Sequence, residues 1–518
     1  MAANIVESHT LNFTDLTGSK TGCVTLGSNK FWKGWVEDLG NGLANFECRW
    51  GPTGEKGSDK GSERGMSLSA ATAQLRKKVA EKEKKGYTKL DTRSDAEEVQ
   101  KAAAKGINIT NAPTAPVVIA SSAPAFHPEV GRLLGVIYGA TSNAVRSGLS
   151  AQAGATEANP IGNLSDRQLD LGGAILDEIG VLLERRIGAE ADVDGSKTLP
   201  LRADGVPDND IIELTNRFMS NVPREIGRSQ RGRENLHQIV ISGWDRLVAQ
   251  RTFLQLLRDA HIAKGTFAAA AAATTSGGKE QVWYDGLQAT IDLCAPGSAD
   301  YNRVVEIFNT AQSKKNANWW RGSQPAVRVA RVFKFTRNGT EARFNAYAET
   351  VIRKPGAVGK IMAWHGTRTE NLLGIGKAGL LMPENLPRGV QIAGKAFGMG
   401  LYHAPAWNAT GHKAVCGLPT DGTNGAFKSL NYTSATGAYY GSGNTSKNAF
   451  MFLQDVALGL AETRTSACFN QHRPANYPKN DFIFACGSKN NGGFVHDELV
   501  TFSQDAQIFR YLVEIEVV

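Results

Sequence analysis

The sequence has no long apolar run. No segment of its 518 residues approaches the roughly 18 apolar residues that a membrane span needs. The first residues, MAANIVESHT, lack the basic-then-apolar pattern of a secretory signal. The six cysteines are scattered, with no C-x-x-C pair and no metal-like spacing to the nine histidines, which argues against a disulfide framework or a zinc site. We therefore expect an intracellular protein with no membrane partner.

The composition is that of a soluble globular protein. Apolar residues make up 41% of the chain and charged residues 21%, and the length favours two to four domains, each with its own core. The formal net charge of +8 favours polyanionic partners only weakly, because a mild positive balance is common.

Composition and periodicity divide the chain into regions. Residues from about 10 to 95 are rich in glycine and lysine and end in a helix-like stretch with Leu75 and Val79 four apart. The Ala/Pro/Ser-rich segment 101–125 is typical of a linker. Residues 126–318 carry helical periodicity. Ser165 and Gln168 form a capping box, and one apolar face follows at Leu169, Leu176, Ile179 and Leu183.

Two further patterns complete this division. The alanine-rich segment 265–281 is low in complexity and predicts an exposed loop. From about residue 319 the apolar period changes to two, which predicts strands at VRVARVFKF, AFMFLQDVAL, DELVTF and RYLVEIEVV. In the last of these, apolar residues alternate with Glu514 and Glu516, as in a half-buried strand. We expect a multidomain α+β protein.

The stretch IMAWHGT is the first candidate site. A strand over Ile361–Trp364 would end on His365-Gly366-Thr367, before a short helix that stops at Gly379. A glycine at such an edge lets a ligand reach the backbone N–H and C=O groups, and the imidazole of His365 could bond a sugar hydroxyl. A histidine at a strand end is more often structural, so other residues must support a ligand site.

Further motifs downstream add that support. FGMGLY contains Tyr402, and KSLNYT contains Ser429 and Tyr432; a tyrosine offers a flat apolar face and a phenol at its rim, although either could be a core aromatic. If Val500 of DELVTF faces inward, period two places Glu498 on the same face. A carboxylate aimed inward needs a partner or a task, because an unpaired one is costly; the alternative is a strand-end glutamate in solvent.

Together these motifs resemble the catalytic domain of the poly(ADP-ribose) polymerases, with His365, Tyr402 and Glu498 at its His-Tyr-Glu triad. NKFWKGWVEDLGNGLANFECRWGPTGEKG resembles the WGR domain, and PIGNLSDRQ with LTNRFMSNVPREIG resembles the helical regulatory domain. The resemblance covers about residues 25–518. It implies a small β-rich WGR-like domain, a linker, an all-α regulatory domain and a mainly antiparallel β ADP-ribosyltransferase domain, at residues 10–100, 101–125, 126–318 and 319–518.

The resemblance implies transfer of ADP-ribose from NAD, as co-substrate, to protein acceptors including the protein itself, with no metal. Gly366 would hold the nicotinamide carboxamide through its backbone, with a hydroxyl contact from Ser429, and Tyr402 and Tyr432 would sandwich the ring. The transition state would carry positive charge on the ribose, as in glycoside hydrolysis.

The same resemblance assigns the sugar contacts. His365 would bond a ribose 2′-hydroxyl, and Thr367 and Asn371 match positions at the adenine-side ribose. Glu498 would orient the nicotinamide ribose, stabilise its charge and activate an acceptor hydroxyl. Lys428 matches a lysine beside that glutamate.

The chain departs from the family pattern within the catalytic region. The segment between Tyr402 and Lys428 is longer than usual, so assigning Ser429 and Tyr432 assumes an insertion; an ungapped match would choose Thr410 and Lys413. Met399 stands where a lysine is common, and Leu381 where some relatives have an arginine. Met399 favours a mono-ADP-ribosyltransferase, whereas Glu498 and Lys428 favour polymer synthesis.

The first domain also departs from its pattern. Its signature reads Trp50-Gly51-Pro52, so the arginine of WGR is a proline, and one charged phosphate contact is lost. Arg49, Trp50 and the lysines Lys77 and Lys78 could still hold DNA ends or nicks, although a basic helix face is usually only solvated. We expect a DNA-activated enzyme, nuclear in a eukaryote, or in the nucleoid or cytoplasm of a prokaryotic or viral system. A non-catalytic DNA-end binding protein is the third hypothesis.

Overall fold

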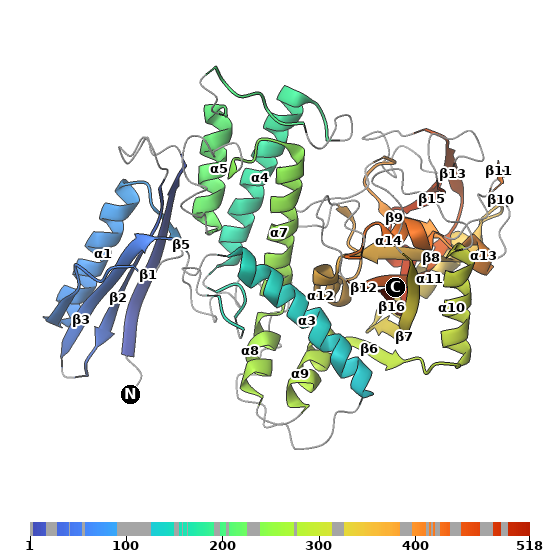
Figure 1. Cartoon of the computed structure of the whole chain (residues 1–518), viewed down its shortest axis with the longest axis horizontal. Coiled ribbons are helices and arrows are strands. Elements are labelled where there is room, and N and C mark those ends of the chain that lie inside the picture. The colour runs from blue at the N-terminus through green and yellow to red at the C-terminus, as the bar shows by residue number, and fades with distance from the viewer. Residues whose placement is uncertain are drawn as a thin grey trace. The chain divides into compact units, whose positions relative to one another are not determined.

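The structure is a computed structural model, and its chain forms two compact units (Figure 1). One comprises residues 1–117, 142–272 and 387–391, and the other residues 118–141, 273–386 and 392–518. The predicted linker 101–125 lies outside the described residues. The structure describes residues 4–16, 28–40, 42–53, 57–90, 126–149, 155–157, 159–162, 164–190, 197–203, 207–224, 239–273, 277–312, 326–383, 396–410, 414–415, 418–419, 425–435, 447–466, 480–487 and 496–518.

The first unit begins with a five-stranded antiparallel sheet in the order β4-β3-β2-β1-β5. Helix α1 covers one face with Leu75 and Val79, both buried, so the predicted helix is confirmed. Its first turn is capped by the hydroxyl of Ser67, which accepts from Ala70 N at 3.2 Å. The elements are β1 (Asn4–Asp15), β2 (Ser28–Asp38), β3 (Leu43–Pro52), β4 (Glu63–Ser67), α1 (Leu68–Lys84) and β5 (Thr88–Leu90).

Helices form the rest of this unit. The capping box of Ser165 and Gln168 is confirmed at the start of α4, and the predicted apolar face of α4 is buried. The loop predicted for the alanine-rich segment is wrong, because residues 264–272 form α8 with Phe267 and Ala270 buried. Alanine has the highest helix propensity, which outweighs low complexity. The helices are α4 (Asp166–Ile187), α5 (Asn209–Asn221), α7 (Trp244–Ile262) and α8 (Lys264–Ala272).

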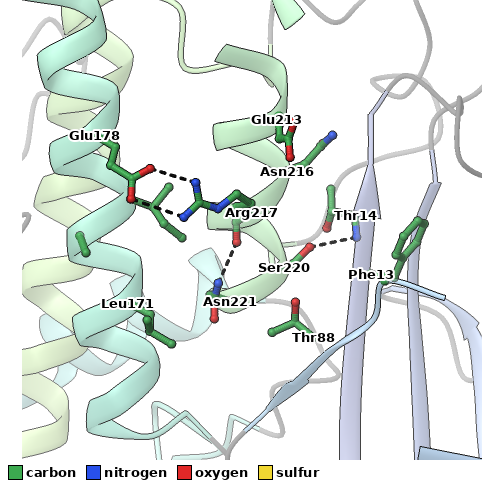
Figure 2. Close-up of a pocket in the computed structure, with 13 residues that line it drawn as sticks. Phe13, Thr14, Thr88, Leu171, Glu178, Glu213, Asn216, Arg217, Ser220 and Asn221 are labelled. Carbon is green, nitrogen blue, oxygen red and sulfur yellow. Dashed lines mark hydrogen bonds and ion pairs between the residues drawn. The ribbon is translucent and has the colours of Figure 1, made fainter. Parts of the chain in front are cut away.

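Strand β1 packs against α5 through polar contacts (Figure 2). Thr14 N donates to the hydroxyl of Ser220 at 3.2 Å. The side-chain amide of Asn12 donates to the carbonyl of Met219 at 3.2 Å. A cavity of about 320 Å³ lies beside these contacts, with the ion pair of Arg217 and Glu178 in its wall at 2.9 Å. The first sheet and the helices are therefore one packed unit.

The second unit is built on a nine-stranded sheet in the order β13-β14-β15-β9-β8-β12-β16-β7-β6. All neighbours are antiparallel except β13 and β14, so the expected antiparallel-rich domain is confirmed. Strand β6 comes from a segment for which periodicity predicted helices only. The strands are β6 (Ala289–Leu293), β7 (Val327–Arg337), β8 (Gly359–Thr367), β9 (Leu401–Pro405), β12 (Asn448–Leu458), β13 (Ala461–Arg464), β14 (Phe482–Ala485), β15 (Glu498–Thr501) and β16 (Gln507–Val517), with a separate pair β10 (Ala414–Val415) and β11 (Leu418–Pro419).

Helices of different lengths accompany this sheet. Gly339, at φ 74°, precedes α11, which the sequence reading missed inside the predicted β region. The helices are α3 (Pro128–Gly148), of which residues up to 141 belong to this unit, α9 (Gly278–Leu287), α10 (Ala299–Gln312), α11 (Thr340–Ile352), α12 (Leu372–Ala378), α13 (Trp407–Thr410) and α14 (Ala426–Leu430), with 3₁₀ turns η4 (Thr369–Asn371) and η9 (Gln504–Ala506).

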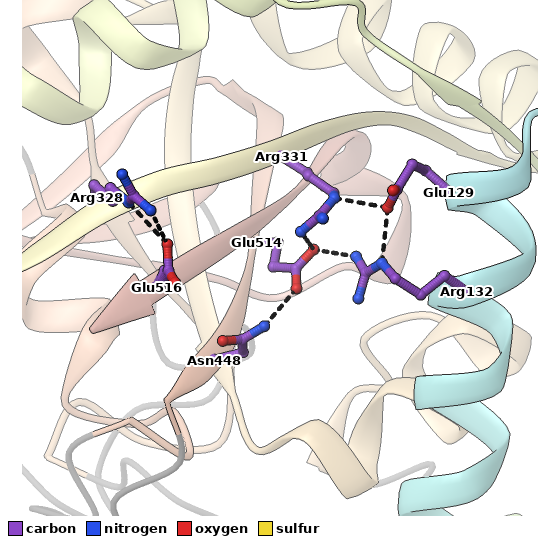
Figure 3. Close-up of polar contacts among 7 residues, drawn as sticks. All are labelled: Glu129, Arg132, Arg328, Arg331, Asn448, Glu514 and Glu516. Atoms are coloured by element: carbon purple, nitrogen blue, oxygen red, sulfur yellow. Dashed lines mark hydrogen bonds and ion pairs between the residues drawn. The ribbon is translucent and has the colours of Figure 1, made fainter. Parts of the chain in front are cut away.

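A buried carboxylate joins α3 to the sheet (Figure 3). Glu514 of β16 is 0% exposed and accepts from Arg132 of α3, from Arg331 of β7 at 3.4 Å and from Asn448 of β12 at 2.8 Å. Glu129 bonds both arginines, at 2.8 and 2.7 Å. The alternation correctly predicted strand β16, but half-burial is wrong at Glu514 because this polar cluster encloses it.

Candidate active site

Strand β8 carries the first candidate residues. Residues 361–364 are buried, with β12 on one side and β9 on the other, and His365-Gly366-Thr367 ends the strand. The chain then turns through η4 into α12, and Gly379, at φ 80°, ends that helix as predicted. The apolar run therefore stops where the predicted ligand-binding residues begin.

His365 is neutral at physiological pH. Burial lowers the pKa of its imidazole to about 4, and a hydrogen bond to the backbone of Tyr402 opposes that shift. Because this bond raises the pKa, it stabilises the protonated ring, so a ring N–H of His365 donates to the backbone carbonyl oxygen of Tyr402. The second ring nitrogen of neutral His365 is then an acceptor, as a bond from a sugar hydroxyl requires.

Gly366 lies directly against α14. A Cβ added at Gly366 would overlap the carbonyl oxygen of Ser429, so only glycine fits at this contact. At the start of α14, a Cβ on Gly425 would lie 2.5 Å from the Cβ of Ala404 on β9. These two glycines thus allow α14 to pack closely against β8 and β9. It is Ser429, the residue of the gapped alignment, that the fold brings beside Gly366.

The two tyrosines lie in different settings. The phenol oxygen of Tyr402 accepts from Phe397 N at 2.8 Å and donates to the carbonyl of Gly398 at 2.9 Å. Its ring packs near Val500 of β15. Tyr432 follows α14, is partly exposed, and its backbone N–H bonds the carbonyl of Ser429 at 3.0 Å.

Glu498 is the first residue of β15, the strand next to β9. Its side chain is 19% exposed and forms an ion pair with Lys428 of α14. Asp497, which the sequence reading missed, is buried; it accepts from the Trp407 indole at 2.9 Å and from Gly487 N at 2.7 Å. These bonds hold the backbone just before Glu498. The sequence signal that could have identified Asp497 is the pair of acidic residues, Asp497 and Glu498, at the start of a predicted strand.

Thr367 and Asn371 lie together past the end of β8. The Asn371 amide donates to the Thr367 hydroxyl at 3.3 Å, and Thr367 is buried. The neighbouring Thr369 N donates to the hydroxyl of Ser434, beyond α14, at 3.0 Å. The candidate residues therefore lie on three adjacent strands, on one short helix and in the turns that follow them.

Neither a cluster of metal-ligand side chains nor a membrane-spanning helix is present among the described residues. Among these residues, no group of three or more histidine, cysteine, aspartate or glutamate side chains gathers as metal ligands would. Within the same ranges, every helix is too short or too polar to cross a membrane.

The predicted DNA-binding residues divide over two faces of the first sheet. Trp50 pairs with Trp32, which packs under α1, whereas Arg49 pairs with Lys33 and points to the opposite face. Trp50 is 43% exposed, and its indole donates to the carbonyl of Lys60 at 3.0 Å. On α1, Lys77 is exposed, and Lys78 forms an ion pair with Glu81 at 3.2 Å.

Comparison with known families agrees with this domain order. A WGR domain model matches residues 7–94, a poly(ADP-ribose) polymerase regulatory domain model matches 125–281, and a poly(ADP-ribose) polymerase catalytic domain model matches 298–410. The fold and the matched models thus define a protein of WGR, regulatory and catalytic domains. The chain belongs to the poly(ADP-ribose) polymerase family.

Individual relatives are distant. The chain is 23% identical over 249 residues to poly [ADP-ribose] polymerase 1 of Gallus gallus, which is 47% of this chain and 20% of the relative. It is 24% identical over 246 residues to the protein of the same name from Arabidopsis thaliana, again 47% of this chain and 20% of the relative. The matched region is thus about one fifth of each relative. The catalytic model ends before Lys428, Ser429, Tyr432 and Glu498.

Proposed function

We propose that this protein is an NAD-dependent ADP-ribosyltransferase that modifies proteins, extends the product into a polymer and is stimulated by DNA breaks. The observation that supports it most is the meeting of Gly366 with Ser429 and of Glu498 with Lys428 at one short helix, α14. Under this proposal, Gly366 would offer its backbone to an amide, and Glu498 would offer a carboxylate to a sugar.

The nicotinamide would be held by backbone and hydroxyl groups. The backbone N–H and C=O of Gly366 would pair with the carboxamide, and the Ser429 hydroxyl would add a third bond. The rings of Tyr402 and Tyr432 would enclose the aromatic ring. Tyr402 suits this role because its phenol is anchored in the loop before β9, which holds the ring in one orientation.

The ribose would be oriented by His365 and Glu498. Neutral His365 would accept from a 2′-hydroxyl, while Thr367 and Asn371 would contact the adenine-side ribose. The bond between the ribose anomeric carbon and the nicotinamide nitrogen breaks, and its electron pair leaves with nicotinamide. Glu498 would stabilise the positive charge on the sugar and take the proton of the attacking acceptor hydroxyl. Lys428 would hold the carboxylate of Glu498 in one direction through their ion pair.

Labelled NAD tests the chemistry. We expect wild-type protein to release nicotinamide and to become labelled, and Glu498→Gln to lower that rate by on the order of 10² to 10⁴. Glu516→Gln is the matched control, because Glu516 lies on β16 in an exposed ion pair with Arg328. Absence of nicotinamide release from wild-type protein, with or without nicked DNA, would refute the enzyme and favour a DNA-end binding protein.

The two finer parts of the proposal have separate readouts. Product length on a gel distinguishes polymer from single ADP-ribose units, and single units would support the reading that Met399 favours. Nicked DNA is expected to raise the rate if the first domain, within about residues 10–100, holds DNA and acts on the regulatory helices. The location would then be where DNA is, in a nucleus or nucleoid.

A further inference from the structure

Beside the candidate site lies a buried polar cluster to which the proposed chemistry gives no role. It consists of His403 on β9, Gln454 on β12 and Thr501 on β15, which are 2%, 0% and 1% exposed. Three polar side chains from three different strands are costly to bury unless they bond one another. We call these residues the His403 cluster.

The bonds within the His403 cluster determine its proton positions. The Gln454 amide nitrogen lies 2.7 Å from His403 Nδ1, and His403 Nε2 lies 2.9 Å from the Thr501 hydroxyl. With the Gln454 amide oriented as in the structure, its nitrogen donates to Nδ1, and Nε2 carries the hydrogen that it donates to Thr501. Burial, together with nearby His365, lowers the pKa of His403 to about 3, so the imidazole stays neutral.

Strand register places the His403 cluster on the face of the sheet that carries His365. Gln454 pairs with Ala363, two residues before His365, and Trp364 pairs with Ala404, so that His403 falls level with His365. Side chains at paired positions share a face. The small side chain of Ala363 leaves room for Gln454 to reach across β8 to β9. The cluster therefore links β12, β9 and β15 across the strand that ends in His365.

Backbone pairing alone ties these strands only weakly. Strands β8 and β9 pair at two positions, and β9 and β15 at three. His365, Tyr402 and Glu498 leave these same strands at or next to the paired positions. Side-chain hydrogen bonds between these strands thus matter most here, because few backbone hydrogen bonds fix the spacing of the three candidate catalytic residues.

We propose that His403 is a positioning residue, whose bonds to Gln454 and Thr501 hold β8, β9 and β15 at the spacing that lets His365, Tyr402 and Glu498 act on one substrate. The inference rests on the proposed function. It assigns His403 no contact with the substrate.

Thr501 gives the sharpest test, since two substitutions separate its hydroxyl from its packing. Thr501→Val keeps the shape and deletes the hydroxyl, whereas Thr501→Ser keeps the hydroxyl and deletes a methyl group. A positioning role predicts that Thr501→Val lowers kcat by about tenfold or more with KM for NAD changed less than about threefold, because misplacement costs rate. Thr501→Ser should retain kcat within about threefold of wild type.

The competing view, in which the residue only fills space, predicts the reverse order. Thr501→Ser would then be the more damaging change, and that result overturns the proposal, as does an unchanged kcat in Thr501→Val. Thr215→Val is the control, because Thr215 is also a buried threonine with a hydrogen-bonded hydroxyl, on α5. Gln454→Leu should lower kcat as Thr501→Val does, and the double variant should be no worse than either single one.

A second readout does not depend on activity. In protein with ¹⁵N-labelled histidine, Thr501→Val should shift the ring-nitrogen signals of His365, while Thr215→Val should leave them in place. If wild-type protein releases no nicotinamide, the proposed function fails, and the His365 signals still decide whether the cluster positions that ring. Unchanged His365 signals in Thr501→Val would overturn the inference.

Discussion

At the scale of single residues, the contact of Gly366 with Ser429 is the tightest constraint in the candidate site. No side chain fits at position 366, because its Cβ would occupy the space of a backbone carbonyl in α14. Backbone atoms cannot move aside as a flexible side chain can. The contact therefore couples the end of β8 at Gly366 to the helix that carries Lys428 and Ser429.

Gly366→Ala is expected to lower nicotinamide release by on the order of 10² or more, since α14 must move away from β8. The measurement is the rate with labelled NAD at matched folded concentration. Gly139→Ala in α3 is the control: a Cβ there meets nothing within 4 Å, and alanine favours the helix. Activity of Gly366→Ala close to wild type would contradict the site as described.

The buried carboxyl of Asp259 on α7 is expected to make the free energy of unfolding depend on pH. Burial raises the pKa of its carboxyl from 3.8 to about 7, although Gln255 donates to it at 2.6 Å. The folded state thus binds this proton more tightly than the unfolded state does. The contribution of this group to the free energy of unfolding is therefore greatest at low pH, and it falls as the pH rises from about 4 to about 7.

Asp259→Asn should therefore stabilise the protein more at about pH 8 than at about pH 5, by about 2 to 3 kcal/mol. Chemical denaturation at both pH values, followed by helical circular dichroism, measures the difference. Glu213→Gln, at an exposed position of α5, is the control and should show no such trend. An equal effect of Asp259→Asn at the two pH values would mean that the carboxyl is ionised throughout.

At the scale of elements, α3 and β16 are joined by the cluster around Glu514. Glu514→Gln would leave Arg132 and Arg331 short of a buried negative charge, and it is expected to destabilise the second unit by about 3 to 5 kcal/mol. Glu516→Gln, in an exposed pair on the same strand, should cost less than about 1 kcal/mol. Urea denaturation compares the two, and equal effects would show that burial of Glu514 adds nothing.

Hydrogen exchange adds a local measurement for the same cluster. In Glu514→Gln, the first turns of α3 should exchange faster, because Arg132 holds them to the sheet. Exchange in α4, which has no residue in the cluster, should stay as in wild type.

Periodicity predicted which segments form helices and strands better than it predicted how deeply their side chains are buried. It identified α1, α4, β7 and β16, since each has a clear apolar face of its own. It missed α11 and β6, where short segments leave too few periods to decide. It misjudged Glu514 because burial of that side chain comes from Arg132, which lies far away in sequence.

The candidate site divides in the same way. Local motifs pointed to His365, Tyr402 and Glu498 individually, while their positions on β8, β9 and β15 follow only from strand order. Asp497 and the His403 cluster were missed, because a buried hydrogen-bond network joins residues about fifty to a hundred positions apart and leaves no local pattern.

At the scale of the whole molecule, the first domain should bind DNA through charge. Arg49→Ala is expected to weaken binding to nicked DNA and to make the slope of log affinity against log salt shallower by about one. Lys77→Ala should act in the same direction from the other face of the sheet. Arg353→Ala, an exposed arginine of the second unit paired with Glu349, is the control. Unchanged salt slopes in both test variants would remove these residues from the interface.

The place of β16 in the sheet bears on how the protein is made. This strand comes after all the other strands of its sheet in chain order, yet it lies between β12 and β7. Until a ribosome has released it, β7 and β6 have no partner connecting them to β12 and β8. The sheet that holds the candidate site therefore closes only after β16 has been synthesised, and a nascent chain stalled before residue 507 would expose two open strand edges to chaperones or to other chains.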